Sequence, residues 1–537
     1  MEPVLRILSS MNLLSSAAVL ALVSAIFLAA AGLWFSQRNI LPFPPGPSPE
    51  PVLGHYRLIS ENAPFRQYAR WSKEYKSDVL FFWTFGTKWV VLNSVAAAVE
   101  LLEKRGLNYA DRPRFVMFEE MGWGPTMTWL RWGSKYKLHR RALQPPFTRS
   151  RVGEYAGLQQ REALRCCLGM LDRPDDWLGA VRRFAVAVVL KIAYGLDIDG
   201  PDSPWLKMAE DTSEAVGKSG APASSIMDRF PPARYLPDWL PFMERLRYAR
   251  AWRPAIEKIT REPFEASLKA MSSGTGGESF VHTKMRTWAK NQQNGLASEF
   301  DLDDIQGAAA TIVIAGNDTT AATLMLLVLY LMQNPLVQRR AQEEIDCVVG
   351  RDRLPTWSDL PGLQYVNLVL QETYRMNPLS PLGVPHASIA DDVYRGMFIA
   401  RGTIVYPNVW AMCHDETVYK DPFVFRPERY LPRDKGGDDE PLPVGNFGFG
   451  RRNCIGKHLA ENGLLIVLST LLATANIGWP LGEDGKPAPF EPEWSFRGQA
   501  IVLPFKASIT SRSAESRALL EKKLAMMSAT AQELGSQ

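Results

Sequence analysis

The chain has 537 residues, of which 46% are hydrophobic, 22% charged and 10% aromatic. This apolar content excludes a disordered chain, and no linker long enough to separate domains follows the first fifty residues. The formal net charge is +4 without a dense block of Lys and Arg, which argues against a nucleic-acid-binding protein. The five cysteines are odd in number and Cys166 adjoins Cys167, which favours a reducing compartment over a disulfide framework.

The first predicted element is a membrane span. Residues 7–37 contain no charged side chain, and residues 13–35 are almost wholly apolar. As a helix this run is roughly 34 Å long, enough to cross a bilayer core of about 30 Å. A cleaved signal peptide is the alternative, because Arg6 precedes the run and small residues lie at 29–31. Signal cores have only about 7–15 apolar residues, so we expect an uncleaved anchor.

The chain is predicted to have four parts. Residues 1–40 form the membrane anchor, and the flanking charges do not fix its orientation. Residues 41–54 are rich in proline, which restricts the backbone, and are expected to form a stiff hinge. The body covers residues 55–510, and residues 511–537 form a C-terminal tail.

The body is predicted to be mainly α with a small β portion. Residues 79–85 and 89–93, rich in β-branched and aromatic side chains, indicate a hairpin, and short strands are expected near 393–399 and 403–406. Helical patterns cover residues 135–143, 154–171, 181–194, 302–332, 336–349, 363–374 and 459–475. Surface loops are expected at 272–277, 290–297 and 434–440, and residues 519–527 form either a final amphipathic helix or a frayed tail.

The most informative cysteine is Cys454. It lies in a glycine-rich loop directly before an apolar helix, where free backbone N–H groups and Arg452 are expected to favour the thiolate. A cysteine nucleophile would need a base, and no histidine can be assigned to that role from the sequence. A zinc site is a second interpretation, but Cys413, His414, Cys454 and His458 lack the usual spacing.

The spacing Phe447-x-x-Gly450-x-Arg452-x-Cys454-x-Gly456 resembles the haem-binding signature of the cytochrome P450 monooxygenases. The resemblance implies the cytochrome P450 fold and a heme b whose iron is bound by the Cys454 thiolate. Two other blocks occur in the family's order, Glu372-x-x-Arg375 and Pro427-Glu428-Arg429. The resemblance implies that Glu372, Arg375 and Arg429 form a buried ionic cluster behind the haem.

Further site residues follow from the same resemblance. The long helix at residues 302–332 resembles the family's oxygen-activating helix, where Thr319 would hold oxygen and water and Asp318 would supply protons. Without the resemblance, the alternative is that Asp318 is a structural acid satisfied by a nearby arginine or by backbone. Haem propionates need cations or hydrogen-bond donors. The candidates are Tyr136, which replaces the family's usual Trp, with Arg140, His386 and Arg452.

The resemblance implies a monooxygenase that inserts one oxygen atom from O2 into an apolar small molecule. Residues 228–237 resemble fungal, basidiomycete, members, so we expect a terpenoid or polyketide of secondary metabolism as substrate; detoxification of xenobiotics is the alternative. The pocket is expected to draw on residues 114–129, 226–240, 308–315, 382–384 and 496–499. Two functions of a different class stay open: a peroxide isomerase or dehydratase of the same fold, and a non-enzymatic haem-binding sensor.

The expected partners follow from the domain content. No flavin or iron–sulfur domain is fused, so electrons must come from a separate NADPH-cytochrome P450 reductase, alone or together with cytochrome b5. The remaining partners are O2, the small apolar substrate and membrane lipid, with no nucleic acid. The expected location is the endoplasmic reticulum membrane, with a single span and the catalytic domain facing the cytosol.

Overall fold

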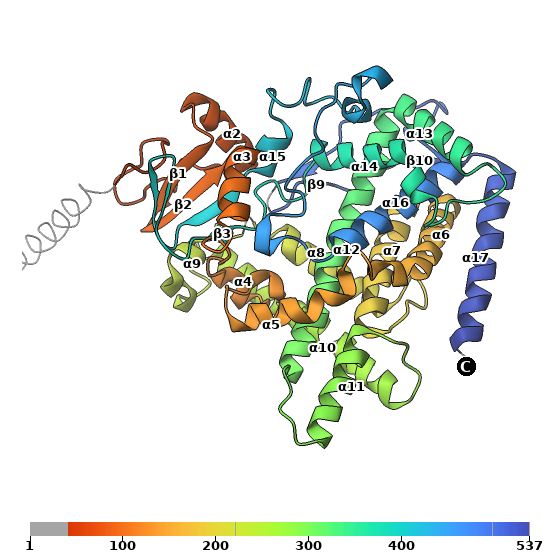
Figure 1. Cartoon of the computed structure of the whole chain (residues 1–537), viewed down its shortest axis with the longest axis horizontal. Coiled ribbons are helices and arrows are strands. Elements are labelled where there is room, and N and C mark those ends of the chain that lie inside the picture. Colours follow the sequence, from red (N-terminus) through yellow and green to blue (C-terminus); the bar gives the residue numbers. More distant parts are fainter. Residues whose placement is uncertain (1–40, 221, 497, 536–537) are drawn as a thin grey trace, which may run out of the picture.

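The computed structural model describes residues 41–535 except 221 and 497, so the predicted span at residues 13–35 lies outside the described residues. Helices make up most of the described chain, and the main sheet lies at the end where that chain begins (Figure 1). The α-helices are α2 (Pro64–Glu74), α3 (Val95–Ala98), α4 (Val116–Glu120), α5 (Ser134–Leu143), α6 (Ala156–Asp172), α7 (Trp177–Tyr194), α8 (Pro204–Gly217), α9 (Ile226–Arg229), α10 (Glu244–Ser272), α11 (Phe280–Gln293), α12 (Leu302–Gln333), α13 (Pro335–Val348), α14 (Gln364–Met376), α15 (Val409–Cys413), α16 (Lys457–Thr474) and α17 (Ala514–Gly535). The strands are β1 (Val79–Thr84), β2 (Thr87–Leu92), β3 (His386–Ala387), β4 (Asp392–Tyr394), β5 (Met397–Ile399), β6 (Ile404–Pro407), β7 (Ala475–Gly478), β8 (Trp494–Ser495), β9 (Ile501–Val502) and β10 (Ser508–Ser511).

The largest sheet has four strands in the order β1-β2-β6-β3. β1 and β2 form the predicted hairpin, with Val79 opposite Leu92, and β2 pairs in parallel with β6. The short strands expected near 393–399 are present as β4 and β5, which pair antiparallel. Arg395 and Gly396 between them have φ values of 49° and 77°, which turn the chain back on itself.

The proline-rich segment is docked against the body. The Pro45 carbonyl accepts a hydrogen bond from the Phe81 N–H of β1 at 3.0 Å, and the Pro42 carbonyl accepts one from Phe398 of β5 at 2.8 Å. The Phe43 ring stacks on Phe81 with 4.4 Å between centroids. The segment is therefore held to two strands, while the domain boundaries at residues 41, 55 and 511 stay predictions.

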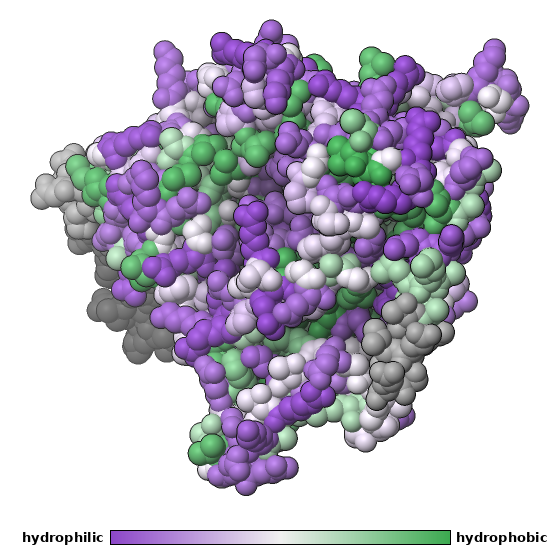
Figure 2. Space-filling model, turned by 45° about the vertical axis from the view of Figure 1, so that its right-hand side comes forward, coloured by the Kyte–Doolittle hydropathy of each residue, from purple (hydrophilic) through white to green (hydrophobic). Residues whose placement is uncertain are grey.

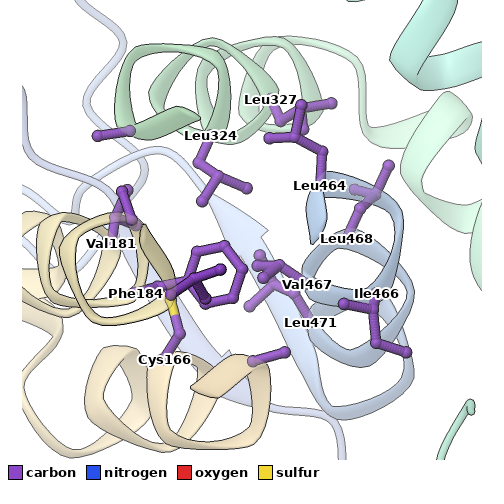
Figure 3. Packing of buried hydrophobic residues seen from close by; sticks show 14 of the residues in the cluster. Cys166, Val181, Phe184, Leu324, Leu327, Leu464, Ile466, Val467, Leu468 and Leu471 are labelled. Carbon is purple, nitrogen blue, oxygen red and sulfur yellow. The ribbon is translucent and has the colours of Figure 1, made fainter. Parts of the chain in front are cut away.

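The core is built where α6, α7, α12 and α16 meet. In Figure 3, Phe184 of α7 lies among Leu324 of α12, Val467 of α16 and Cys166 of α6. In the described part of the chain, α12 is the one helix long and apolar enough to cross a membrane, but 67% of its most apolar window is buried. It is thus the central helix of a packed core.

Several helices differ from the sequence-based expectation. The helix α10 was not predicted, because its sequence is polar on average and contains Pro254 and Pro263. The loop expected at 290–297 begins too early, since α11 continues to Gln293. At the C-terminus, α17 is a long helix that packs on α6 and α16 and buries Leu520. The side of the molecule that carries α17 is mostly hydrophilic, with apolar residues in small groups (Figure 2).

Candidate active site

The cysteine loop is closed by a backbone hydrogen bond and by glycine. The Cys454 N–H donates to the Phe447 carbonyl at 2.8 Å, which folds the loop ahead of α16. Gly450 has a φ of 54°, and a Cβ at this position would lie 2.1 Å from the Leu102 carbonyl oxygen in the π-helix η2 (Val99–Lys104). Only glycine fits such a close approach, so the loop is pressed against η2.

The thiol of Cys454 lies deep in the protein, and burial raises its pKa. Backbone N–H groups of Gly456 and Lys457 and the charge of Arg140 act in the opposite direction. The helix N-terminus thus favours the thiolate as expected, but burial outweighs it, and the cation that acts on the thiol is Arg140 rather than the predicted Arg452. Cys454 is nevertheless accessible, so its side chain is not covered on all sides by packed neighbours.

Two buried guanidinium groups lie close together beside this loop. The Arg452 Nε–H donates to the Ala110 carbonyl at 2.6 Å, and Arg112 donates to the Pro385 carbonyl at 2.8 Å. Burial lowers the pKa of Arg112 to about 9, and the neighbouring charge of Arg452 lowers it further. Burial likewise lowers the pKa of Arg452 to about 10. Arg112 Nε and Arg452 Nη2 have no hydrogen-bond partner among the described residues.

The three other residues predicted to bind the haem propionates, His386, Tyr136 and Arg140, donate their hydrogen bonds to groups within the protein. His386 in β3 donates its Nδ1–H to the Tyr109 carbonyl at 2.8 Å, and burial, together with Arg112, holds its pKa well below the usual range. The Tyr136 hydroxyl donates to the Arg451 carbonyl at 2.9 Å. Arg140 donates to the carbonyl and the side-chain oxygen of Asn453, each at 2.8 Å, and so fastens the cysteine loop to α5.

The middle of α12 has one open face. Ala315 is exposed although Val313 and Asn317 beside it are buried. The Thr319 hydroxyl donates to the Ala315 carbonyl one turn back at 2.9 Å. Burial raises the pKa of Asp318 to about 6, and Asp318 Oδ2 is buried without a partner in the described part of the chain.

Glu372, Arg375 and Arg429 are brought together and are fully buried. Arg375 donates to both carboxylate oxygens of Glu372 at 2.8 Å, and Arg429 donates to one of them at 3.0 Å. Tyr430 donates to the other oxygen at 2.7 Å. A buried carboxylate with this many donors is fully paired, which is the condition for keeping it inside a protein.

The predicted pocket segments share an apolar wall. Phe118 and Trp123 from the first segment, Met227 and Leu240 from the second, and Ile314 of α12 belong to one cluster. Leu382 and Val384 from the fourth segment pack against the same cluster. Of the fifth segment, Gln499 lies near Asp318, whose pKa it lowers by hydrogen bonding.

A zinc site finds no support in the residues that the structure describes, where no group of three or more His, Cys, Asp or Glu side chains could hold a metal ion. A haem fits the residues present better. Two desolvated arginines with unpaired N–H groups suit carboxylates such as haem propionates, and Cys454 next to them is accessible.

Comparison with known proteins agrees with this arrangement. Residues 44–496 match the cytochrome P450 family model, which covers most of the chain. The chain belongs to the cytochrome P450 family. Cytochrome P450s bind haem iron through a cysteine thiolate and receive electrons from a reductase, and relatives of this chain are named as monooxygenases.

Three of the similar proteins come from fungi. Cytochrome P450 monooxygenase COX1 of Coprinopsis cinerea is 32% identical over 90% of this chain and 94% of its own length. Cytochrome P450 monooxygenase ple1 of Rhodocybe pseudopiperita is 33% identical, over 89% and 91% of the two chains. Tryptamine 4-monooxygenase of Psilocybe cyanescens is 32% identical, over 83% and 88%. The chain is thus a monooxygenase of the cytochrome P450 family.

Arg112 is a candidate site residue that the sequence did not reveal. It stands between Asp111 and Pro113 in a loop, and an arginine in such a context is usually on the surface. Its burial depends on the carbonyl groups of residues 384 and 385, which are distant in the sequence.

Proposed function

We propose that this cytochrome P450 hydroxylates, or oxidises in a related way, an apolar small molecule of terpenoid or polyketide type. The observation that carries the proposal is the cysteine loop, in which Cys454 is accessible beside two buried arginines with unpaired N–H groups. When bound, a haem with a thiolate ligand supplies the activation of O2 and the transfer of one oxygen atom. Cys454 is the proposed ligand to the iron.

Arg112 and Arg452 are the groups proposed to bind the haem propionates. Hydrogen bonds to backbone carbonyls hold both guanidinium groups in place. Each guanidinium group keeps one unpaired N–H that can donate to a carboxylate oxygen. An anion also relieves the mutual repulsion of two buried cations. Tyr136, Arg140 and His386 act in this proposal through the backbone: they hold the carbonyls of Arg451, Asn453 and Tyr109 that shape the site.

Proton supply is the proposed task of Asp318 and Thr319. Insertion of one oxygen atom consumes O2, two electrons and two protons, and yields the oxidised product and water. A carboxyl with a pKa of about 6 exchanges protons readily near neutral pH, so Asp318 is suited to hold and release a proton there. The Thr319 hydroxyl oxygen retains lone pairs that can accept a hydrogen bond from water.

The substrate class is inferred from the apolar wall. Phe118, Trp129 and Phe115 are in ring contact, with 4.2 Å between the first two centroids, and Met117 and Met121 adapt to irregular shapes. Such a wall holds a ligand by shape rather than by charge.

The proposed location is the endoplasmic reticulum membrane, with residues 13–35 as the span and the catalytic domain in the cytosol. An exposed group of large apolar side chains lies on residues 230–242: Tyr235, Trp239 and Phe242 are 83%, 71% and 78% exposed. The turn of the β1–β2 hairpin adjoins this segment, because the Thr87 hydroxyl donates to the Arg229 carbonyl at 3.3 Å. β1, β2 and α9 lie at the end of the molecule where the described chain begins (Figure 1). Lipid contact there would accompany the anchor.

Electrons are proposed to come from an NADPH-cytochrome P450 reductase, with cytochrome b5 as a second donor. Lys135 and Lys457 lie near the two ends of the cysteine site, on α5 and α16, and are about half exposed. Neutralising both should slow haem reduction and flatten its dependence on salt, since surface charges steer an acidic partner.

The test is a difference spectrum of the dithionite-reduced protein with and without carbon monoxide. The wild type should show the strongly red-shifted Soret band of a thiolate-bound haem, and Cys454→Ala should lose it. Arg112→Leu should keep the band position but lower the haem content. Arg114→Leu is the matched control, because Arg114 pairs with Glu119 on the surface. A band at the shorter wavelength of histidine ligation would refute the role of Cys454.

A further inference from the structure

His139 is a buried histidine of α5 that forms a hydrogen bond with the start of α12. Its side chain is 1% exposed, and its Nε2 lies 3.0 Å from Oδ1 of Asp304 in the first turn of α12. An ionised carboxylate only accepts hydrogen bonds, so Nε2 carries the hydrogen and donates it. Burial lowers the pKa of His139, which keeps the ring neutral, and Nδ1 has no hydrogen-bond partner among the described residues.

The pair of His139 and Asp304 is unfavourable as a mere packing contact. The Asp304 side chain is only 10% exposed, and Nδ1 of the histidine is buried without a hydrogen bond. Two apolar side chains of similar shape would fill this interface without either desolvation cost. A hydrogen bond to a charged group is directional, however. Its direction sets how α5 is oriented on α12.

The helix α5 depends on such a contact because its own sequence gives it little stability. It has 10 residues, no side chain caps its N-terminus, and Lys135 and Lys137 lie near its start, where the helix dipole disfavours cations. Helices this short are marginal on their own. Lys135 also lies 3.7 Å from Asp304 Oδ1, but it is 53% exposed and too distant for a hydrogen bond. His139 therefore carries the hydrogen bond to α12.

The cysteine loop is held in turn by α5. Arg140 donates to the carbonyl and to the side-chain oxygen of Asn453, each at 2.8 Å, directly before the cysteine. The Tyr136 hydroxyl donates to the Arg451 carbonyl at 2.9 Å. Successive residues of an α-helix are about 100° apart around its axis. A rotation of α5 that broke the hydrogen bond of His139 would therefore also swing Arg140 away from the loop.

We propose that His139 is a positioning residue for the axial ligand: its hydrogen bond to Asp304 fixes α5 on α12 and thereby keeps Cys454 in place to bind iron. The inference rests on the proposed role of Cys454 in binding haem. His139 acts through Tyr136 and Arg140, which make the contacts to the loop. Loss of its hydrogen bond should loosen the loop and let haem leave faster.

The test compares His139→Phe with His282→Phe in the haem-loaded full chain. His282 is the matched control, because it is also 1% exposed and its Nε2 lies 3.2 Å from the Ser267 carbonyl, but it joins α11 to α10. His139→Phe should release haem to a haem-free acceptor protein about tenfold faster or more, the effect of losing one hydrogen bond to a charged group. Amide hydrogen exchange of residues 447–456 should accelerate as well. His282→Phe should leave both rates at the wild-type values.

Two further variants keep the proposal testable if His139→Phe does not fold. Glutamine retains an N–H that can donate to the carboxylate, so His139→Gln should keep both rates close to those of the wild type. Asp304→Asn removes the charge of the acceptor and should speed haem release. Where His139→Phe folds, adding Asp304→Asn to it should change nothing further, because the two residues act through one hydrogen bond.

Equal haem release and equal exchange of the loop in His139→Phe and His282→Phe would overturn the inference. The proposed function would remain intact in that case, provided that the wild type shows the thiolate Soret band, whereas absence of that band in the wild type would refute the function itself. If His139→Gln loses haem as fast as His139→Phe, the shape of the ring rather than its hydrogen bond holds α5, and the proposal is wrong.

Discussion

The guanidinium carbon of Arg452 lies 3.6 Å from the centre of the Tyr136 ring, so the cation rests on the face of the aromatic side chain. The same tyrosine donates its hydroxyl hydrogen to the carbonyl of Arg451. Tyr136 therefore has two separable tasks: its ring supports a proposed propionate ligand, and its hydroxyl holds the cysteine loop.

The two tasks predict different effects for two substitutions. Tyr136→Phe keeps the ring and should retain haem nearly as well as the wild type. Tyr136→Ala removes a partly buried cation–π contact of about 1–2 kcal/mol, and haem should dissociate roughly tenfold faster. The rate of haem transfer to a haem-free acceptor protein measures this. If Tyr136→Phe loses haem as quickly as Tyr136→Ala, the hydroxyl rather than the ring carries the effect.

Thr319→Ala should uncouple NADPH consumption from product formation. Without the hydroxyl the open face of α12 loses its hydrogen-bonding group, so hydrogen peroxide should replace product several-fold. The control is Thr323→Ala, because the buried Thr323 hydroxyl donates to the Thr319 carbonyl at 2.8 Å and is used within the helix. The ratio of peroxide to NADPH consumed is the measurement. Normal coupling in Thr319→Ala would refute the proposed role of the Thr319 hydroxyl in proton supply.

Asp318 makes a pH-dependent contribution to stability. Its pKa rises from 3.8 to about 6 on folding, because burial disfavours the charged form. The native state therefore holds the proton more tightly than the unfolded state, and stability falls as pH rises from about 4 to 6. Asp318→Asn should remove this loss, at most about 3 kcal/mol, so it should stabilise the protein at pH 7.5 relative to pH 4. Urea unfolding at both pH values tests this, with the exposed Asp202→Asn as control.

Arg429→Ala should destabilise the fold by about 3–5 kcal/mol, because it leaves a fully buried carboxylate with one arginine fewer. Arg340→Ala provides the comparison: Arg340 also pairs with a glutamate, at 3.1 Å, but is 47% exposed. Its loss should cost less than about 1 kcal/mol. Denaturant midpoints of the two variants would decide, and similar midpoints would contradict the structural role of the cluster.

The apolar segment at residues 230–242 should bind lipid without the anchor. A variant lacking residues 1–40 should sediment with phosphatidylcholine vesicles, and Trp239→Ser with Phe242→Ser should abolish this. The control pair is Leu336→Ser with Phe423→Ser, which removes apolar side chains that are 75% and 61% exposed elsewhere. Equal loss of binding in both pairs would show that the contact is unspecific.

The sequence predicted a structural feature well where residues close together in the chain determine it. The spacing of Glu372 and Arg375 places both on one helix face, and the structure joins them. The glycine-rich loop before α16 likewise indicated where the backbone must turn. The sequence patterns did not predict α10, because prolines and a polar composition hide a helix whose stability comes from packing against α4 and α8.

The site was harder to predict where residues meet across the fold. The side chain of Arg112 is held in its buried position by hydrogen bonds to carbonyl groups in another segment. Nothing in its neighbours along the chain distinguishes it from a surface arginine. The roles of Tyr136, Arg140 and His386 were inferred as direct contacts to a carboxylate. In the structure Tyr136 and His386 donate to backbone carbonyls, and Arg140 donates to a backbone carbonyl and to side-chain oxygens, which sequence alone does not show.

The docking of the proline-rich segment limits how far the body could lie from the predicted span. Because Pro42 is hydrogen-bonded to β5, only residues 36–41 of the sequence separate the predicted span from the docked segment. Even fully stretched, these residues reach about 25 Å. The catalytic body would then be confined to a thin layer above the bilayer, and a lipid-soluble substrate would have only a short distance to travel from the lipid to the protein.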